Sequence, residues 1–254
     1  MSCKAVIDLS GEWQLSCDRE GFAPIPAKVP GENCTALMEA GLAPDPNLKF
    51  NERDFQWVRD HDWTWSRTFE VPAEFLRRER IWLNIDSLDT VGTVRINGKT
   101  AAESDNMFLR IRRDVRDLLH EGENRIEVII TAVEKYIRKQ SLKQPVHYPG
   151  GYFCHIKEMN LVRKIQCQSG WDWGLCVPVS GMYGEISLNA SDGVRLEHVY
   201  TEQDHGPGIC RLAVCAELDR TEPGREEVVF EFNGERRSVT AEVPAGISCV
   251  RTEF

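Results

Sequence analysis

The sequence lacks any apolar run near the roughly 20 residues that a membrane span needs, and it lacks a signal peptide's apolar core before its first acid, Asp8. It also lacks an excess of basic residues, because 31 Lys and Arg stand against 40 Asp and Glu, for a net charge of −9 over 254 residues. Such a charge disfavours binding to nucleic acid or to anionic lipid. We therefore expect a cytoplasmic protein whose partners include neither a nucleic acid nor a membrane.

The nine cysteines include no Cys-x-x-Cys pair, and their number is odd. Without an export signal, reduced thiols are expected rather than a disulfide framework. Cys154-His155, Cys167 and Cys176 lack the spacing of zinc ligands. The sequence predicts no metal site and no cofactor.

What the sequence does contain is β-type alternation. Trp63, Trp65, Arg67, Phe69 and Val71 share one parity, and all but the arginine are large and apolar, which predicts a half-buried strand. Comparable patterns cover residues 9–15, 80–85, 93–96, 124–130 and 184–188. About eight strands with long loops and little helix predict an all-β fold, with a jelly-roll β-sandwich over residues 1–190.

The segments between these strands carry turn and helix signals. Asn97-Gly98 predicts a two-residue hairpin, because a type I′ turn needs positive φ at both positions. Residues 33–40 predict two helical turns that stop at Gly41. We expect irregular backbone over the proline-rich residues 24–30 and a loop over residues 43–57.

A second β pattern follows the linker-like residues 190–193. Strands are expected over residues 194–199, 210–218, 227–232 and 235–243, with a second Asn-Gly hairpin at Asn233-Gly234. These spacings predict an immunoglobulin-like β-sandwich over residues 191–254. About 60 residues fall short of the about 100 of such a domain, so we expect this domain to be incomplete.

The stretch Ser169-Gly170-Trp171-Asp172-Trp173-Gly174 places one carboxylate between two large rings. In one interpretation it is a sugar subsite, with ring faces against the C–H side of a pyranose and Asp172 accepting hydroxyl hydrogen bonds. A charged acceptor strengthens each such bond to roughly 1.5–3 kcal/mol. In the alternative interpretation both tryptophans pack in the core and Asp172 caps a turn.

Several further motifs accompany this stretch in a fixed order. They are Asp8-Leu9-Ser10-Gly11-Glu12-Trp13, Pro44-Asp45-Pro46, Phe55-Gln56-Trp57-Val58, Asp62-Trp63-Thr64-Trp65, Leu88-Asp89-Thr90-Val91, Asn97-Gly98, Ser104-Asp105-Asn106-Met107-Phe108 and Arg163-Lys164-Ile165-Gln166. The full set resembles the N-terminal half of glycoside hydrolase family 2 enzymes. The Asp-Asn-Met and Arg-Lys…Trp-Asp-Trp-Gly segments resemble its β-mannosidases more than its β-galactosidases or β-glucuronidases.

The resemblance implies that residues 1–190 form the family's jelly-roll sugar-binding domain and that residues 191–254 belong to its first immunoglobulin-like domain. It implies that the intact enzyme hydrolyses terminal β-D-mannose residues with net retention. The loop with Asp172 would reach the mouth of a following (β/α)8 barrel of the same parent chain, where Asp172 helps to hold the terminal mannose. Trp171 and Trp173 would be the walls or supports of that loop.

The catalytic groups of the family are absent from these residues. Retaining glycosidases need two carboxyl groups about 5–5.5 Å apart, which in this family are glutamates on a barrel of about 250 residues. The resemblance therefore implies no catalytic residue here and no hydrolysis by this chain alone. Asn51-Glu52 copies the dipeptide of the family's acid/base, but it lies in an expected loop without a partner, so we interpret Glu52 as structural.

Other interpretations stay open. The chain could be a stand-alone carbohydrate-binding module, a structural interaction module, or part of an enzyme with β-galactosidase- or β-glucuronidase-like specificity. Arg163 and Lys164 are expected either to pair with acids beneath Asp172 or to be solvated. Leu175 and Met182-Tyr183 depart from the family's usual proline and isoleucine-tryptophan, and His61, His147 and His155 are interpreted as solvated loop residues.

Overall fold

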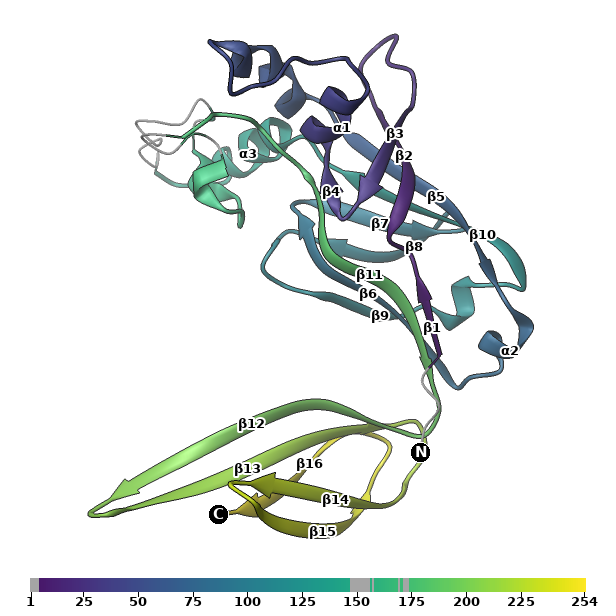
Figure 1. The fold of residues 1–254 in the computed structure, drawn as a ribbon, viewed down its shortest axis with the longest axis vertical. Helices are drawn as coiled ribbons and strands as arrows, with labels where there is room; N and C mark the ends of the chain where they lie inside the picture. The colour runs from purple at the N-terminus through teal and green to yellow at the C-terminus, as the bar shows by residue number, and fades with distance from the viewer. Residues whose placement is uncertain (1–4, 147–155, 157, 169, 171–173) are drawn as a thin grey trace. The chain divides into compact units, whose positions relative to one another are not determined.

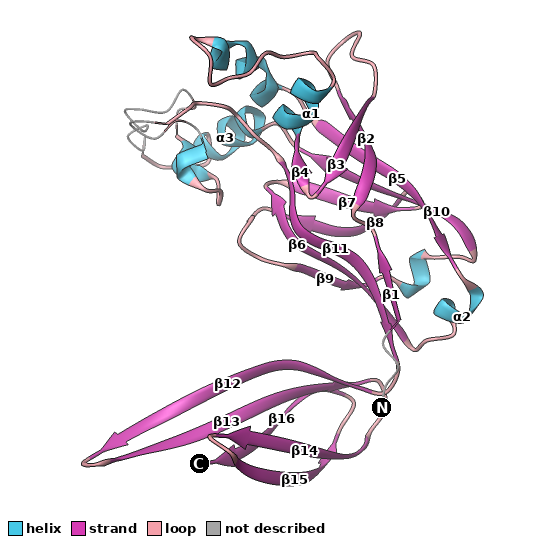
Figure 2. Cartoon of the chain, in the orientation of Figure 1, coloured by secondary structure: helices cyan, strands magenta, loops and turns pink. Residues whose placement is uncertain are grey.

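The computed structural model describes residues 5–146, 156, 158–168, 170 and 174–254. The described chain forms two compact units, Ala5–Ala190 and Ser191–Phe254. Strands dominate both units, and each unit contains two sheets (Figures 1 and 2). The predicted all-β fold is confirmed.

The first unit is a sandwich of two sheets. One sheet has the order β1-β11-β6-β9, with β4 also paired to β11, and its strands are β1 Ala5–Asp8, β4 Gly31–Glu32, β6 Arg80–Asp89, β9 Ile111–Asp114 and β11 Gly181–Ser191. The other has the order β3-β2-β5-β10-β7-β8, with strands β2 Gly11–Cys17, β3 Ile25–Val29, β5 Trp63–Val71, β7 Gly92–Ile96, β8 Lys99–Ser104 and β10 Gly122–Ile130. Two facing sheets of this kind give the predicted jelly-roll architecture.

The core between these sheets follows from the alternation in β5. Trp63, Trp65, Phe69 and Val71 are all buried between the sheets. Arg67 shares their parity, and its Nη1 donates to the carbonyl oxygen of Leu9 at 2.8 Å. A guanidinium on an apolar face is tolerated here because backbone acceptors satisfy it.

Short helices connect the strands, and α1 (Asn33–Glu39), the 3-10 helix η1 (Asn51–Asp60) and α3 (Val133–Ser141) lie at one end of the sandwich (Figure 1). The others are α2 (Ala73–Leu76), η2 (Arg116–Leu118), η3 (Met159–Leu161) and η4 (Gln166–Gln168). Glu32 caps α1, since its two carboxylate oxygens accept from the backbone N–H groups of Cys34 at 2.6 Å and Thr35 at 2.8 Å. The predicted helix is therefore confirmed.

Two expectations for connecting segments are wrong. Residues 24–30 contain the strand β3, and Pro26 fits there because β3 is the terminal strand of its sheet, where a missing N–H need not break a ladder. Residues 43–57 do not form one loop, because η1 begins at Asn51 and buries Phe55 and Val58. Both outcomes depend on contacts between distant parts of the chain.

The second unit has a sheet of order β12-β13-β16 and a hairpin, β14-β15. Its strands are β12 Val194–Gly206, β13 Ile209–Arg220, β14 Gly224–Phe232, β15 Glu235–Val243 and β16 Gly246–Glu253. Both predicted Asn-Gly hairpins are confirmed, with positive φ at Asn97, Gly98, Asn233 and Gly234. The core of this unit consists of Leu212, Val214, Ala216, Leu218, Phe230, Val243 and Val250.

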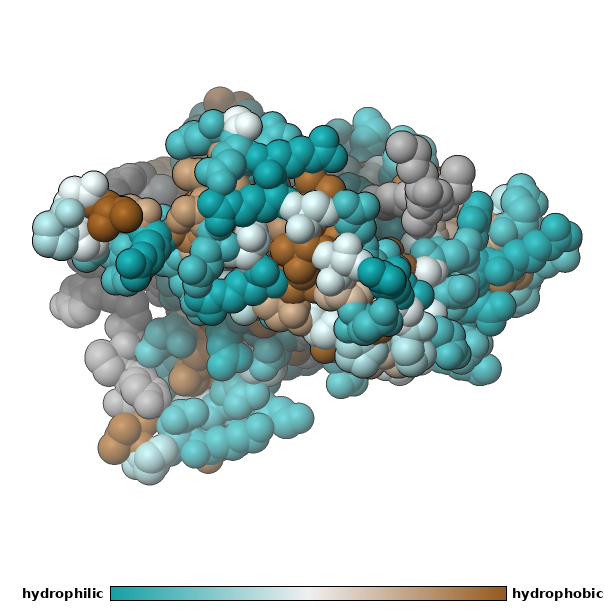
Figure 3. Space-filling model, turned by 90° about the horizontal axis from the view of Figure 1, so that it is seen from below, coloured by the Kyte–Doolittle hydropathy of each residue, from teal (hydrophilic) through white to brown (hydrophobic). Residues whose placement is uncertain are grey.

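Large apolar side chains remain exposed in both units. In the second unit, Leu196 and Val199 are exposed beside a groove of about 580 Å³ between β12, β13 and β14. Figure 3 shows one face of the molecule, on which hydrophobic side chains gather in a patch surrounded by hydrophilic ones. Among the described residues, no helix has the length and apolar character to cross a membrane.

Candidate functional site

Trp171, Asp172 and Trp173, the predicted sugar-contacting residues, lie outside the described residues. The site is therefore defined by the segments on either side of them. We call residues 163–168 the entry stem and residues 174–180 the exit stem. Side chains from distant parts of the first unit hold both stems.

The entry stem is held by the turn between β8 and β9. Met107 N donates to the carbonyl oxygen of Arg163 at 3.0 Å, and the Met107 Sδ lies 3.1 Å from the backbone N of Ile165. The Arg163 guanidinium forms an exposed ion pair with Asp105 at 3.3 Å. Two motifs that are far apart in the sequence thus meet at the start of the tryptophan stretch.

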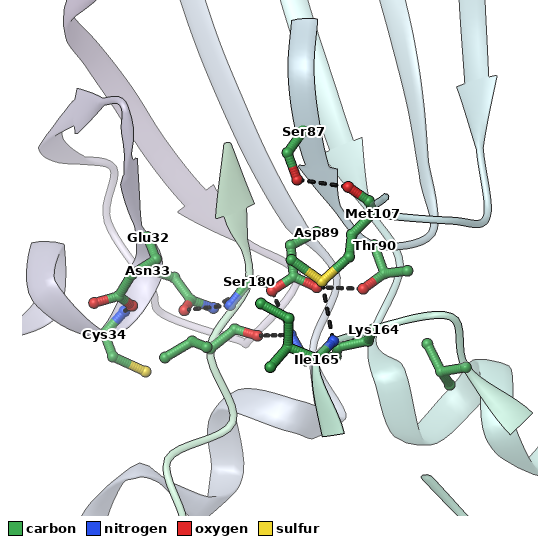
Figure 4. Close-up of polar contacts among 12 residues, drawn as sticks. Glu32, Asn33, Cys34, Ser87, Asp89, Thr90, Met107, Lys164, Ile165 and Ser180 are labelled. Carbon is green, nitrogen blue, oxygen red and sulfur yellow. Dashed lines mark hydrogen bonds and ion pairs between the residues drawn. The ribbon is translucent and has the colours of Figure 1, made fainter. Parts of the chain in front are cut away.

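Lys164 forms a buried ion pair with Asp89 at the end of β6, with side chains that are 3% and 0% exposed. The Thr90 hydroxyl donates to the other Asp89 oxygen, and Lys164 Nζ also donates to the carbonyl oxygen of Val179 at 2.8 Å. Figure 4 shows Asp89, Thr90 and Lys164 converging between β6 and the exit stem. Lys164 therefore ties the entry stem to the exit stem.

Burial and pairing act on the pKa of Lys164 in opposite directions. Burial lowers the pKa of Lys164, and the adjacent Asp89 carboxylate opposes that shift by favouring the ammonium form. An ion removed from water is costly unless a partner and further hydrogen bonds compensate it. The pair is satisfied only when β6 and both stems meet in this arrangement.

The exit stem is held by side chains that replace a neighbouring strand. Cys176 N donates to Glu52 Oε2 at 3.1 Å, and Gln56 Nε2 donates to the carbonyl oxygen of Cys176 at 2.7 Å. Ser180 N donates to Asn33 Oδ1 at 3.0 Å, and Asn33 Nδ2 donates to Ser180 Oγ at 2.9 Å (Figure 4). The regular ladder of β11 then begins at Gly181.

Gly170 and Cys176 bring the ends of the tryptophan stretch together. Gly170 has a φ of +89°, and a Cβ at this position would lie 2.7 Å from the Cβ of Cys176. Both the positive φ and the close approach require glycine. Gly170 and Cys176, on either side of Asp172 in the sequence, are thus packed directly against each other.

The space beside the ion pair is small. A cavity of about 20 Å³ is lined by Asp89, Lys164, Thr131 and Ser180, among others. It has room for one water molecule, whereas small-molecule sites measure about 300–1,000 Å³. Among the described residues, no group of three or more His, Cys, Asp or Glu side chains is placed to hold a metal ion.

The structure decides several predictions about individual residues. Arg163 and Lys164 pair with the acids Asp105 and Asp89, as one of the two open interpretations expected. His61 is solvated only in part, because its side chain is 27% exposed and its Nδ1 lies 2.8 Å from Asp18 Oδ1. His147 and His155 lie outside the described residues.

Sequence reasoning missed the roles of Asn33 and Gln56. Asn33 is fully buried, yet a lone asparagine at the start of a helix carries no signal for a contact with Ser180. Gln56 stands within the motif Phe55-Gln56-Trp57-Val58, which was the one available hint. Of the departures from the family pattern, Leu175 is exposed and Met182 is buried in the core.

The sequence of this chain is similar to those of known glycoside hydrolases. Residues 13–184 match the family model described as glycosyl hydrolase 2 galactose-binding domain-like. β-Mannosidase of Mus musculus is 29% identical over 201 residues, which are 75% of this chain and 22% of that protein. β-Mannosidase B of Thermothelomyces thermophilus is 33% identical over 219 residues, which are 84% of this chain and 25% of that protein.

The fold of this chain is also similar to parts of solved glycoside hydrolase structures. The β-D-mannosidase from Dictyoglomus thermophilum has a TM-score of 0.90 at 29% identity, over 98% of this chain and 31% of that chain. An exo-chitosanase from Amycolatopsis orientalis, with a TM-score of 0.66 and 14% identity, shares the fold. This chain spans less than a third of the length of each of these relatives. Since the family model covers more than half of the chain, the chain belongs to glycosyl hydrolase family 2 and contains that family's galactose-binding domain-like N-terminal region.

Proposed function

We propose that this chain is the non-catalytic N-terminal region of a β-mannosidase and that Asp172, Trp171 and Trp173 contribute to the subsite for a terminal β-mannoside. The rest of the subsite, and both catalytic carboxyl groups, would lie on a (β/α)8 barrel of the same parent chain. The relatives named β-mannosidase, each about three to four times as long as this chain, support this proposal.

The main observation that supports this proposal is the pair of stems on either side of the tryptophan stretch. Lys164 connects them through Asp89 and Val179, and Glu52 and Gln56 fix the backbone of Cys176. Ordering one backbone residue costs about 1–2 kcal/mol. Stems that are fixed before binding remove part of that cost from ligand binding, which is the benefit of preorganisation.

Exposed apolar side chains near the same end of the sandwich support a docking face for the barrel. Leu42, Leu48 and Phe50 lie between α1 and η1. Leu142 and Val146 follow α3, and Leu175 lies in the exit stem. A contiguous apolar surface at this end of the sandwich would be typical of an interaction surface. The cavity of about 20 Å³ beside Lys164 is too small for a sugar, which favours a subsite completed by another domain.

The test begins with the coding sequence past codon 254 and the longest protein that it encodes. That protein should hydrolyse 4-nitrophenyl β-D-mannoside, and Asp172→Ala should lower kcat/KM by about 100-fold or more, because charge-assisted hydrogen bonds of roughly 1.5–3 kcal/mol each are lost. Asp54→Ala, which removes an exposed acid of η1, serves as the control and should leave kcat/KM unchanged. An Asp172→Ala enzyme with full kcat/KM would contradict the proposal.

The alternative functions predict other results. The 254-residue chain should not hydrolyse the mannoside, and calorimetry with mannose should show no binding. Binding that disappears in Asp172→Ala would instead favour a stand-alone carbohydrate-binding module. Faster hydrolysis of a β-galactoside or a β-glucuronide by the long protein would favour another specificity.

A further inference from the structure

We propose that Glu52 and Gln56 are positioning residues that clasp the backbone of Cys176 and thereby fix the exit stem, which follows Asp172 in the sequence. The clasp itself is independent of the proposed function. Its role in sugar binding rests on that function.

The two side chains complement one residue's backbone. The Glu52 carboxylate accepts from the N–H of Cys176 at 3.1 Å, and the Gln56 amide donates to its carbonyl oxygen at 2.7 Å. These are the two hydrogen bonds that an adjacent strand would supply. More than a hundred residues of sequence separate η1 from Cys176, so the clasp is a tertiary contact.

The orientation of the Gln56 amide is itself fixed. Its Nε2 donates a second hydrogen bond to the carbonyl oxygen of Glu52 at 3.0 Å, and Arg59 Nη1 lies 3.4 Å from its Oε1. The amide therefore presents its donor to Cys176 and its acceptor to a cation. An acidic side chain of the same shape could not satisfy these contacts.

The helix that carries the clasp is anchored in the core. Phe55 and Val58 of η1 are 0% and 2% exposed, so η1 cannot shift without opening the sandwich. Cys176 also lies directly against Gly170. A clasp at that point transfers the rigidity of the core to the start of the exit stem.

Thiol reactivity provides a direct test on the 254-residue chain. Cys167 is exposed and Cys176 is buried. The labelling rate of Cys167 therefore reports on the entry stem, and that of Cys176 reports on the exit stem. Iodoacetamide labelling, followed by peptide mass spectrometry, should modify Cys167 quickly and Cys176 slowly. Gln56→Glu keeps the volume but replaces the donor with an acceptor, so it should raise the Cys176 rate at least tenfold and leave the Cys167 rate unchanged.

Two further variants sharpen the test. Glu52→Ala should expose Cys176 to a similar degree, whereas Glu52→Gln retains an acceptor oxygen and should restore most of the protection. Asp54→Ala, in the same helix, should behave as the unchanged chain does. Tryptophan fluorescence during urea unfolding confirms that each variant is folded, and an unchanged Cys176 rate in folded Gln56→Glu overturns the clasp.

The role in positioning has a separate readout. In the long protein, Gln56→Glu should lower kcat/KM for the mannoside about tenfold, and Glu52→Gln should retain most of it. Raised Cys176 reactivity with unchanged kcat/KM would overturn the positioning role. Full kcat/KM in Asp172→Ala would instead contradict the proposed function, while the labelling results would still decide the clasp.

Discussion

The two units reach different degrees of closure from the same strand pattern. In the first unit, both sheets contribute to one core, and Trp63 and Trp65 of β5 are buried almost completely. In the second unit, Leu196 and Val199 of β12 are more than half exposed beside the groove of about 580 Å³. Alternation therefore makes strands in both, but a closed core also needs a second sheet wide enough to cover the first.

The groove is the open face of the second unit. It is lined by side chains of β12, β13 and β14, and among the described strands β14 pairs with β15 alone. A strand placed along the free edge of β14 would cover these side chains and satisfy that edge. We propose that added strands cover this groove in a longer protein.

The largest difference in the free energy of unfolding is expected between loss of a buried ion pair in the first unit and loss of an exposed ion pair in the second. Lys164→Ala leaves Asp89 buried without its partner and should lower the free energy of unfolding by about 3–5 kcal/mol. Arg251 pairs with Glu202 at 3.1 Å, but these side chains are 50% and 58% exposed. Arg251→Ala should therefore cost less than about 1 kcal/mol. Urea unfolding followed by circular dichroism measures both costs.

A double variant provides the control for Lys164. Lys164→Met combined with Asp89→Leu removes the orphaned charge and should recover part of the stability that Lys164→Ala loses. A Lys164→Ala protein as stable as Arg251→Ala would contradict the assignment of this pair as a stabilising link between the stems.

The next effect compares one substitution in the two cores. Leu83 in β6 is 0% exposed, and Leu83→Ala should cost about 2–5 kcal/mol because it opens a closed cavity. Leu212 in β13 lines the open groove, so Leu212→Ala creates little new enclosed space and should cost less than about 2 kcal/mol. All seven tryptophans precede Gly174, so their fluorescence follows the first unit alone, and circular dichroism follows both.

The same pair of variants tests the proposed completion of the second unit. In a longer protein whose added strands cover the groove, the space left by Leu212→Ala becomes enclosed, and the substitution should cost nearly as much as that of Leu83. Equal costs already in the 254-residue chain would show that the groove is closed in solution and would contradict the comparison between the units.

Local patterns explain which parts of the fold the sequence predicts. The predicted bounds of β5 agree with the structure, because alternation is set within one strand, and both Asn-Gly hairpins follow from backbone sterics. The strand around Pro26 and the helix η1 were missed, since the edge position of β3 and the burial of Phe55 depend on distant residues. Propensity does not contain that information.

In the candidate site too, the sequence predicts local motifs but not the contacts between distant residues. The motifs with Lys164 and Asp89 were recognised as a set, but their ion pair joins residues 75 positions apart and no spacing rule predicts it. The clasp by Glu52 and Gln56 is likewise a tertiary contact, although the structural interpretation of Glu52 agrees with it. The role of Asp172 stays a prediction, because Asp172 lies outside the described residues.

The smallest effect tests whether burial, rather than the unit, decides the strength of an ion pair. Asp18 in the first unit accepts from Lys135 Nζ at 2.6 Å and contacts His61 Nδ1 at 2.8 Å, yet its side chain is 45% exposed. Burial raises the pKa of Asp18, but hydrogen bonds from Lys135, His61 and the backbone N–H of Asp62 outweigh it and lower the pKa overall. Asp18→Asn should therefore cost less than about 1 kcal/mol at neutral pH, as Arg251→Ala does.

The direction of the pH dependence follows from that lowered pKa. A carboxyl group whose pKa is lower in the folded state stabilises the protein above its unfolded value of about 3.9, and the contribution is lost as the pH falls through the folded pKa. The difference in unfolding free energy between Asp18→Asn and the unchanged chain should thus shrink as the pH falls below about 4. High salt should shrink it too, because exposed charges are screened. If Asp18→Asn cost more than about 2 kcal/mol and the cost did not fall in high salt, the exposed contacts of Asp18 would be as strong as the buried pair of Lys164 and Asp89. Exposure would then not weaken an ion pair in this protein.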